Sequence, residues 1–323
     1  MSAISASLSA PLRLTLPSRR TMLDVRAETD AERACALLVS GAIDAGMRLA
    51  VALLGRLSAA AEAPSTAADS PSLGRLLTLL RQNPLVSWGR SQHYGYPADP
   101  VFVDMGLGLA QLEAQQTELG MAMYSWMLDQ SSICKALRLR RDYLARCIDS
   151  IAIAEAECRA VSLFGGHARE IHASHRIRTG AVAASLVDYD TQVLARAASA
   201  ADYAPATPLH TCQATLDAML SGQVRLYDCS LLLLTSVTEF LDKNTLSQLL
   251  QSLLDWLRPG GEIVMAAFEE LPESGFLDLA VDWRPNTLSL PALLALTHEL
   301  EQADARVFGE NEGHLGYLHV RRL

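Results

Sequence analysis

The sequence predicts an α/β protein in which a helical N-terminal half precedes a doubly wound, mostly parallel sheet. From residue 160 onward, short apolar runs alternate with helical segments, which is typical of a parallel sheet covered on both faces. A glycine turn, Phe164 to Ala168, follows the first predicted strand. An acid, Asp188, ends the second strand about twenty residues later. Together these features indicate a Rossmann-like nucleotide pocket at the carboxyl ends of the strands.

Composition narrows the class of protein. The chain has 323 residues, 50% of them hydrophobic, which is enough for a sizeable core. The net charge is -9 and no basic block occurs, so we expect no nucleic-acid partner. Six scattered cysteines without a C-x-x-C pair favour reduced thiols and a cytoplasmic protein. The longest mostly apolar run, Cys229 to Val237, is too short for a membrane span.

We expect three segments. Residues 1–28 are predicted to be a flexible N-terminal tail, residues 29–152 a helical substrate or lid domain, and residues 153–323 the nucleotide-binding domain. The Ala- and Leu-rich stretch 29–62 reads as one helix with an apolar face. That face is explained equally by a homodimer contact and by burial inside the monomer.

The remaining elements follow from periodicity and turn residues. Further N-terminal helices are expected at 73–81, 103–128 and 133–152, the last capped by Ser131 or Ser132, with mostly loop at 83–100. Strands are expected at 160–164, 183–187, 231–235, 262–268 and 316–321. The helices between these strands are expected at 168–175, 191–200, 246–257 and 291–303.

Two of these features suggest ligand binding. Gly165 and Gly166 let the backbone approach a ligand, and the helix after them offers free N–H groups, although such a turn is equally often structural. Asp188 can accept both hydroxyls of a ribose. The alternative is a helix N-cap, a role that suits Asp190 in particular.

A third motif, Arg258-Pro259-Gly260-Gly261-Glu262, turns a helix into an apolar strand. With this motif and the glycine turn, residues 160–323 resemble the class I S-adenosylmethionine-dependent methyltransferases. A closer resemblance is to a bacterial subgroup, the extracellular-factor 3-hydroxypalmitic acid methyl ester biosynthesis proteins, and covers most of the chain beyond about residue 85. Its segments here are Ser162–Glu170, Val187–Asp190, Gly275–Trp283, Gly95–Asp99 and the arginines Arg138, Arg140 and Arg141.

The resemblance implies a methyltransferase that uses S-adenosylmethionine and releases S-adenosylhomocysteine. Its subgroup implies O-methylation of the carboxylate of a small or lipid-like acid, covered by the helical lid. The cofactor-binding residues it implies are Phe164, Gly165, Gly166, Ala168, Asp188, Tyr189, Thr215, Thr235 and Ser236.

A carboxylate acceptor is already ionised, so it needs a clamp rather than a strong base. The candidate catalytic and substrate contacts are Tyr96, Arg140, Arg141 and Trp283. Arginine suits a carboxylate because its planar fork binds both oxygens. Each of these residues has a structural alternative. The arginines could lie on a solvated helix face, and only one of them is expected to point inward. Tyr96 and Trp283 could be core aromatics, and Asp99 could cap its loop.

Several positions depart from the family pattern. Ala168 stands for its third glycine, His167 for the subgroup's proline, and residues 235–241 replace the subgroup's segment after the fourth strand. Two alternatives therefore stay open: N- or O-methylation of another small metabolite, and a diverged binding protein without turnover. A Rossmann-type oxidoreductase is less favoured, because it would need the motif G-x-G-x-x-G at the glycine turn. His167, His172 and His175 have no convincing partner ligands, so no metal site is predicted.

Overall fold

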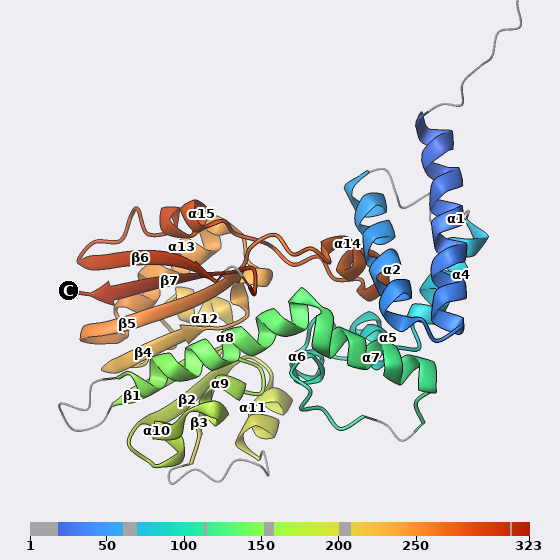
Figure 1. Cartoon of the computed structure of the whole chain (residues 1–323). Helices are drawn as coiled ribbons and strands as arrows, with labels where there is room; N and C mark the ends of the chain where they lie inside the picture. The colour runs from blue at the N-terminus through green and yellow to red at the C-terminus, as the bar shows by residue number, and fades with distance from the viewer. Residues whose placement is uncertain (1–18, 61–69, 113–114, 152–157, 200–207, 311) are drawn as a thin grey trace, which may run out of the picture.

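The computed structural model describes residues 19–60, 70–112, 115–151, 158–199, 208–310 and 312–323. It has two parts, a sheet with helices on both faces and a group of helices beyond one end of that sheet (Figure 1). The predicted α/β, doubly wound class is confirmed. No helix among the described residues has the length and apolar character needed to cross a bilayer.

Seven strands form one sheet in the order β3-β2-β1-β4-β5-β7-β6. The first five are parallel, whereas β7 runs antiparallel to both β5 and β6. The strand order reverses between β1 and β4, so a crevice opens there at the carboxyl ends. The strands are β1 (Arg159–Leu163), β2 (Ala183–Asp188), β3 (His210–Gln213), β4 (Cys229–Leu234), β5 (Leu257–Phe268), β6 (Ala303–Glu310) and β7 (Leu315–Arg322).

Strands β3 and β6 were not predicted. Strand β3 has only four residues, most of them exposed, so it lacks an apolar run. Strand β6 begins at Ala303, where the helix predicted over 291–303 was expected to end. That helix, α15 (Leu290–Ala295), is much shorter. Both misses lie at the edges of the sheet, where one-sided burial weakens the sequence pattern.

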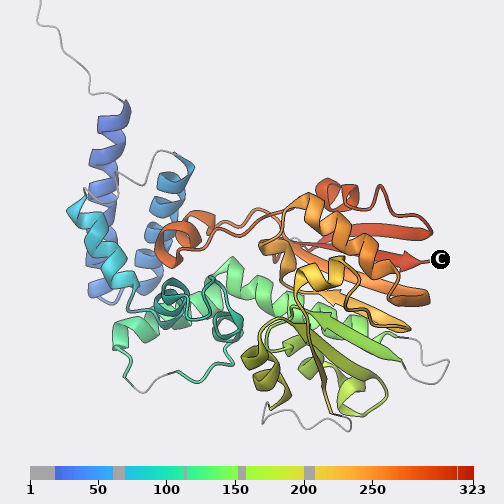
Figure 2. The ribbon, with the colours of Figure 1, turned by 180° about the vertical axis from the view of Figure 1, so that it is seen from behind.

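Each face of the sheet is covered by its own set of helices. Figure 2 shows α12 (Leu216–Leu220), α13 (Lys243–Leu254) and α15 on one face. Their leucines share a core with β1, β4, β5 and β7. On the other face lie α8 (Ser132–Asp149), α9 (Arg169–Ala173), α10 (His175–Arg178) and α11 (Thr191–Ala198).

The helical part differs from the prediction in four places. The single helix expected over 103–128 is two helices, which end at Gly106 and begin again at Glu118. The expected single helix 29–62 is two helices that reverse at Gly41, whose φ of 85° suits a glycine. The predicted tail 1–28 is helical from Arg19, and residues 1–18 lie outside the described chain. The stretch 83–100 contains a helix, because the Asn83 side chain caps Leu85 N–H at 2.9 Å. The helices are α1 (Arg19–Val39), α2 (Ile43–Ala59), α4 (Pro71–Leu80), α5 (Pro84–Ser91), α6 (Pro100–Gly106) and α7 (Glu118–Gln130).

Two connections join the helical part to the sheet. Helix α8, capped by Ser131, runs from one to the other. After β5 the chain returns to the helices through α14 (Ser274–Phe276) and the π-helical turn η2 (Leu277–Val281). There a Cβ on Gly275 would lie 2.5 Å from the Gly55 Cα, so α14 and α2 touch backbone to backbone.

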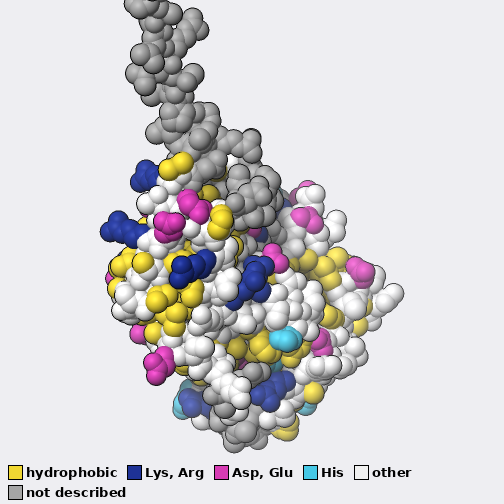
Figure 3. All heavy atoms as spheres, turned by 90° about the vertical axis from the view of Figure 1, so that its right-hand side faces the viewer, with side chains coloured by type: hydrophobic (Ala, Val, Ile, Leu, Met, Phe, Trp, Pro, Cys, Tyr) yellow, Lys and Arg dark blue, Asp and Glu magenta, His cyan; other side chains and the backbone are white. Residues whose placement is uncertain are grey.

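The apolar residues of α1 and α2 that suggested a homodimer contact are buried in the monomer. Cys35, Leu38, Met47 and Leu54 all join the core of the helical part. The homodimer therefore stays a prediction without these residues to support it. On the end of the molecule formed by these helices, positive and negative side chains are interspersed (Figure 3).

Candidate active site

A cavity of about 560 Å³ lies at the carboxyl ends of β1, β2 and β4, where the strand order reverses. Helices α6 and α8 contribute to its wall, so the helical part covers the sheet crevice. Its volume lies within the range of small-molecule sites. The cavity brings together these predicted site residues: Tyr96, Arg140, Arg141, Phe164, Gly165, Gly166, Asp188, Tyr189, Thr215, Thr235 and Ser236.

Two predicted residues do not line the cavity. Trp283 is 2% exposed and packs edge-on against Phe102 and Phe268, with ring centroids 5.5 and 6.2 Å away. It is a core aromatic, the alternative named for it above. Ala168, the last residue of the glycine turn, is fully buried.

The turn after β1 has left-handed backbone conformations at positions where the sequence has no glycine. Phe164, Gly166 and Ala168 have φ values of 51°, 59° and 53°, so left-handed residues alternate as in a G-x-G-x-G turn. Only one of the three is a glycine, and the left-handed conformation costs a non-glycine residue about 1–2 kcal/mol of conformational free energy. Gly165 must be a glycine for another reason, since a Cβ would lie 2.0 Å from Ser162 Oγ.

Asp188 is a buried carboxyl at the cavity wall. It is 5% exposed, and its Oδ1 accepts the Asp190 N–H at 3.0 Å. Burial raises its pKa from 3.8 to about 6. The N-cap role belongs to its neighbour, because Asp190 accepts the Gln192 N–H at 2.7 Å. Asp188 is therefore available for a ligand, with the half-exposed ring of Tyr189 beside it.

A second acid at the cavity, Glu170, was not singled out from the sequence. Burial raises the pKa of this carboxyl. It accepts hydrogen bonds from Ser162 Oγ at 2.5 Å and Thr235 Oγ1 at 3.4 Å. These bonds join the end of β1 to the end of β4 beneath the glycine turn.

Both candidate clamp arginines are already paired. Arg140 is 2% exposed and forms a buried ion pair with Glu239, while its Nη2 donates to Ser236 Oγ at 3.4 Å. Arg141 pairs with the adjacent Asp142 at 2.6 Å. Both Arg140 and Arg141 line the cavity, where only one inward arginine was expected, and the charge of Arg140 is used inside the protein. The third of the group, Arg138, donates to the Leu128 carbonyl at 2.7 Å.

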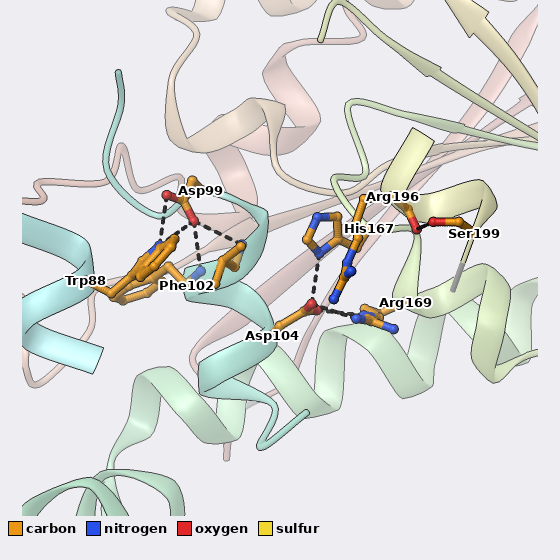
Figure 4. A network of polar contacts seen from close by, with 9 residues as sticks. Trp88, Asp99, Phe102, Asp104, His167, Arg169, Arg196 and Ser199 are labelled. Carbon is orange, nitrogen blue, oxygen red and sulfur yellow. Dashed lines mark hydrogen bonds and ion pairs between the residues drawn. The ribbon is translucent and has the colours of Figure 1, made fainter. Parts of the chain in front are cut away.

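His167 and Asp104 form a pair that the sequence did not reveal. His167 Nδ1 lies 2.8 Å from Asp104 Oδ2, and Arg169 donates to both oxygens of the same carboxylate at 2.6 Å (Figure 4). All three residues line the cavity. Although burial opposes it, the hydrogen bonds from Arg169 and His167 hold the pKa of Asp104 below its usual value.

Helix α6 presents Asp104 because Asp99 caps that helix. Asp99 Oδ1 accepts the Val101 and Phe102 N–H groups at 2.9 Å and is also held by Trp88 Nε1 (Figure 4). The loop-cap alternative for Asp99 is confirmed.

Aromatic side chains form much of the remaining wall. Tyr96 and Phe240 meet edge to face, with ring centroids 5.8 Å apart. Burial, with Tyr189 nearby, raises the pKa of Tyr96, so its phenol stays protonated at neutral pH. The aromatic lining residues are Tyr94, Tyr96, Phe164, Tyr189 and Phe240.

Comparisons with known proteins support the fold. No protein-family model and no curated protein matches the sequence. Among solved structures, a possible exported protein from Bordetella parapertussis is 17% identical and aligns over 95% of this chain and 99% of its own, with a TM-score of 0.54. The S-adenosylmethionine-dependent methyltransferase SibL, in its apo form, is 13% identical and aligns over the same shares with a TM-score of 0.50.

At such identities the likeness establishes the fold and nothing finer. Both matches extend through the helical half as well as the sheet. The chain therefore shares its fold with these two structures, a doubly wound sheet with a helical part over the crevice.

Proposed function

We propose that this protein is an S-adenosylmethionine-dependent methyltransferase acting on a small molecule. The observation that carries the proposal is the left-handed alternation at Phe164, Gly166 and Ala168 beside the buried Asp188, at the reversal of strand order. A nucleoside fits there because Asp188 can accept ribose hydroxyls and the turn lets the ligand approach the backbone. SibL, which shares the fold, is named as a methyltransferase of this kind.

We assign different parts of the cofactor to different residues of the cavity. Asp188 and Tyr189 would hold the ribose and base, and Thr215, Thr235 and Ser236 offer hydroxyls from the ends of the neighbouring strands. When bound, the cofactor supplies a methyl group on a sulfonium sulfur, which an acceptor takes by in-line displacement. The helices over the crevice would exclude water, as expected of a lid.

The acceptor expected from the subgroup is the carboxylate of a small or lipid-like acid. Arg141 at the cavity wall supports this expectation, because its charge is only partly committed to an exposed acid, Asp142. N- or O-methylation of another metabolite is favoured by the pairing of Arg140 with Glu239 and by the His167–Asp104 pair. A cytoplasmic location stays a prediction.

Calorimetric titration with S-adenosylmethionine, and separately with NAD, tests the cofactor. We expect the first to bind and the second not to, with binding abolished by Asp188→Ala. Asp190→Ala is the matched control, because it removes only a helix cap. Failure of the wild-type chain to bind S-adenosylmethionine would contradict the proposal and favour a diverged binding protein.

A further inference from the structure

His167 has a buried nitrogen that no described residue satisfies. Its side chain is 3% exposed, Nδ1 is held by Asp104, and Nε2 has no hydrogen-bond partner in the described structure. Leaving a buried polar atom unpaired costs about 1–3 kcal/mol. Since His167 lines the cavity, an occupant of that cavity is the natural partner for Nε2.

The pairing also sets the chemistry of the ring. Asp104 stays a carboxylate because two charge-assisted hydrogen bonds from Arg169 fix it. A carboxylate on Nδ1 favours the proton at Nδ1 and leaves a lone pair on Nε2. It also stabilises the imidazolium that forms when Nε2 takes up a proton. This is the arrangement of a general base.

The charges around the cavity disfavour an ionised acceptor. Of its three arginines, Arg140 and Arg169 are held by the buried acids Glu239 and Asp104, and only Arg141, paired with the exposed Asp142, keeps part of its charge for a ligand. Asp188 adds negative charge, and the aromatic side chains offer a flat apolar wall. A carboxylate would lose its hydration there for one partly committed cation, whereas a neutral aromatic molecule needs no cation.

Resting on the proposed function, we propose that the acceptor is a neutral aromatic hydroxyl or amine and that His167, oriented by Asp104, is the base that deprotonates it. The acceptor proton moves to Nε2 as the oxygen or nitrogen bonds to the methyl carbon. The bond from that carbon to the donor sulfur breaks, and the sulfur keeps the electron pair. The imidazolium then releases the proton to water. Asp104 is a positioning residue.

Other titratable and charged groups lie near the ring of His167. They are Asp104 on α6, Arg169 and His172 on α9, and Asp188 on β2. Burial lowers the pKa of His172 to about 4, so this neighbour is neutral at neutral pH.

The test uses two probes with one ring system, 2-naphthol and 2-naphthoic acid, added to the full chain saturated with S-adenosylhomocysteine. We expect 2-naphthol to bind at least about tenfold more tightly than 2-naphthoate. Its absorption should show naphtholate at a pH about one unit lower when bound than when free, because Nε2 accepts its proton. In ¹⁵N-histidine spectra, 2-naphthol should shift the Nε2 resonance of His167.

Two variants and one control separate a base from a structural contact. His167→Gln and Asp104→Asn should abolish the change in the naphthol titration, while S-adenosylhomocysteine still binds. His175→Gln should behave as wild type, because its side chain is exposed outside the cavity. The proposal is overturned by tighter binding of 2-naphthoate, by an unshifted naphthol titration, by an unmoved His167 resonance, or by failure of both probes to bind. If S-adenosylhomocysteine and S-adenosylmethionine do not bind the wild type, the proposed function itself fails.

Discussion

Glu239 lies directly against Arg140, and both side chains are almost completely buried where helix α8 meets the turn after β4. The Arg140 guanidinium also stacks over the Phe268 ring, with its Cζ 5.1 Å from the centroid. The pair therefore joins the helix that crosses the molecule to the strand ends that form the cavity floor.

Glu239→Gln should destabilise the protein by about 3–5 kcal/mol, because it leaves Arg140 buried with an uncompensated charge. Urea unfolding measures this loss. The matched control is Glu312→Gln, which removes the exposed partner of Lys135 and should leave the midpoint unchanged. Equal midpoints for the two variants would show that the buried pair adds nothing.

The proposed function predicts that affinity for S-adenosylmethionine falls as the pH drops through about 6, because a protonated Asp188 carboxyl could not accept two ribose hydroxyls. Calorimetric titrations with S-adenosylmethionine between about pH 5 and pH 8 measure this dependence. Asp188→Asn should bind weakly and show no such pH step. A wild-type affinity that is constant across the range would contradict a carboxylate role.

The Asp188 carboxyl affects the folding stability of the ligand-free protein with the opposite pH dependence. Between its unfolded pKa of 3.8 and its folded value of about 6, the native state binds more protons than the unfolded state. Stability from this group is therefore highest at low pH and decreases as the pH rises through that window. Between the two ends of this window, the free energy of unfolding of the wild type should decrease relative to that of Asp188→Asn. A relative increase with pH would contradict the prediction.

Ala168→Gly should stabilise the protein by about 1 kcal/mol, since a glycine adopts the left-handed conformation there without strain. The control Ala145→Gly, in the middle of α8, should be destabilising by about 1 kcal/mol or more. Thermal unfolding of the two variants gives the signs. Loss of stability in both would mean that the turn carries no strain at Ala168.

Gly275→Ala should loosen the contact between α14 and α2, because the new Cβ would meet the backbone of Leu54 and Gly55 at 2.5 Å. We expect faster hydrogen exchange in α2 and lower stability. Gly74→Ala is the control, since a Cβ there meets nothing within 4 Å and alanine favours the helix. Unchanged hydrogen exchange in α2 would show that the two segments accommodate the new Cβ without loss of stability.

Sequence reasoning located the cavity because the carboxyl ends of parallel strands meet at one edge of the sheet. It placed Asp188 and the glycine turn correctly for this reason. It could not place side chains whose partners are distant in sequence. Arg140 is 99 residues from Glu239, and His167 is 63 from Asp104, so neither pair leaves a local pattern. The left-handed residues at Phe164 and Ala168 were hidden because the signal for such a backbone is glycine.

The double connection between the two parts has a consequence for how the chain folds. Helix α8 enters the sheet region, and the segment after β5 returns to pack Phe276 and Trp283 among the N-terminal helices. A fragment beginning at residue 153 would expose these rings to water, so it should aggregate rather than fold on its own. Denaturation of the intact chain should accordingly be one cooperative transition, with the helices and the sheet melting together.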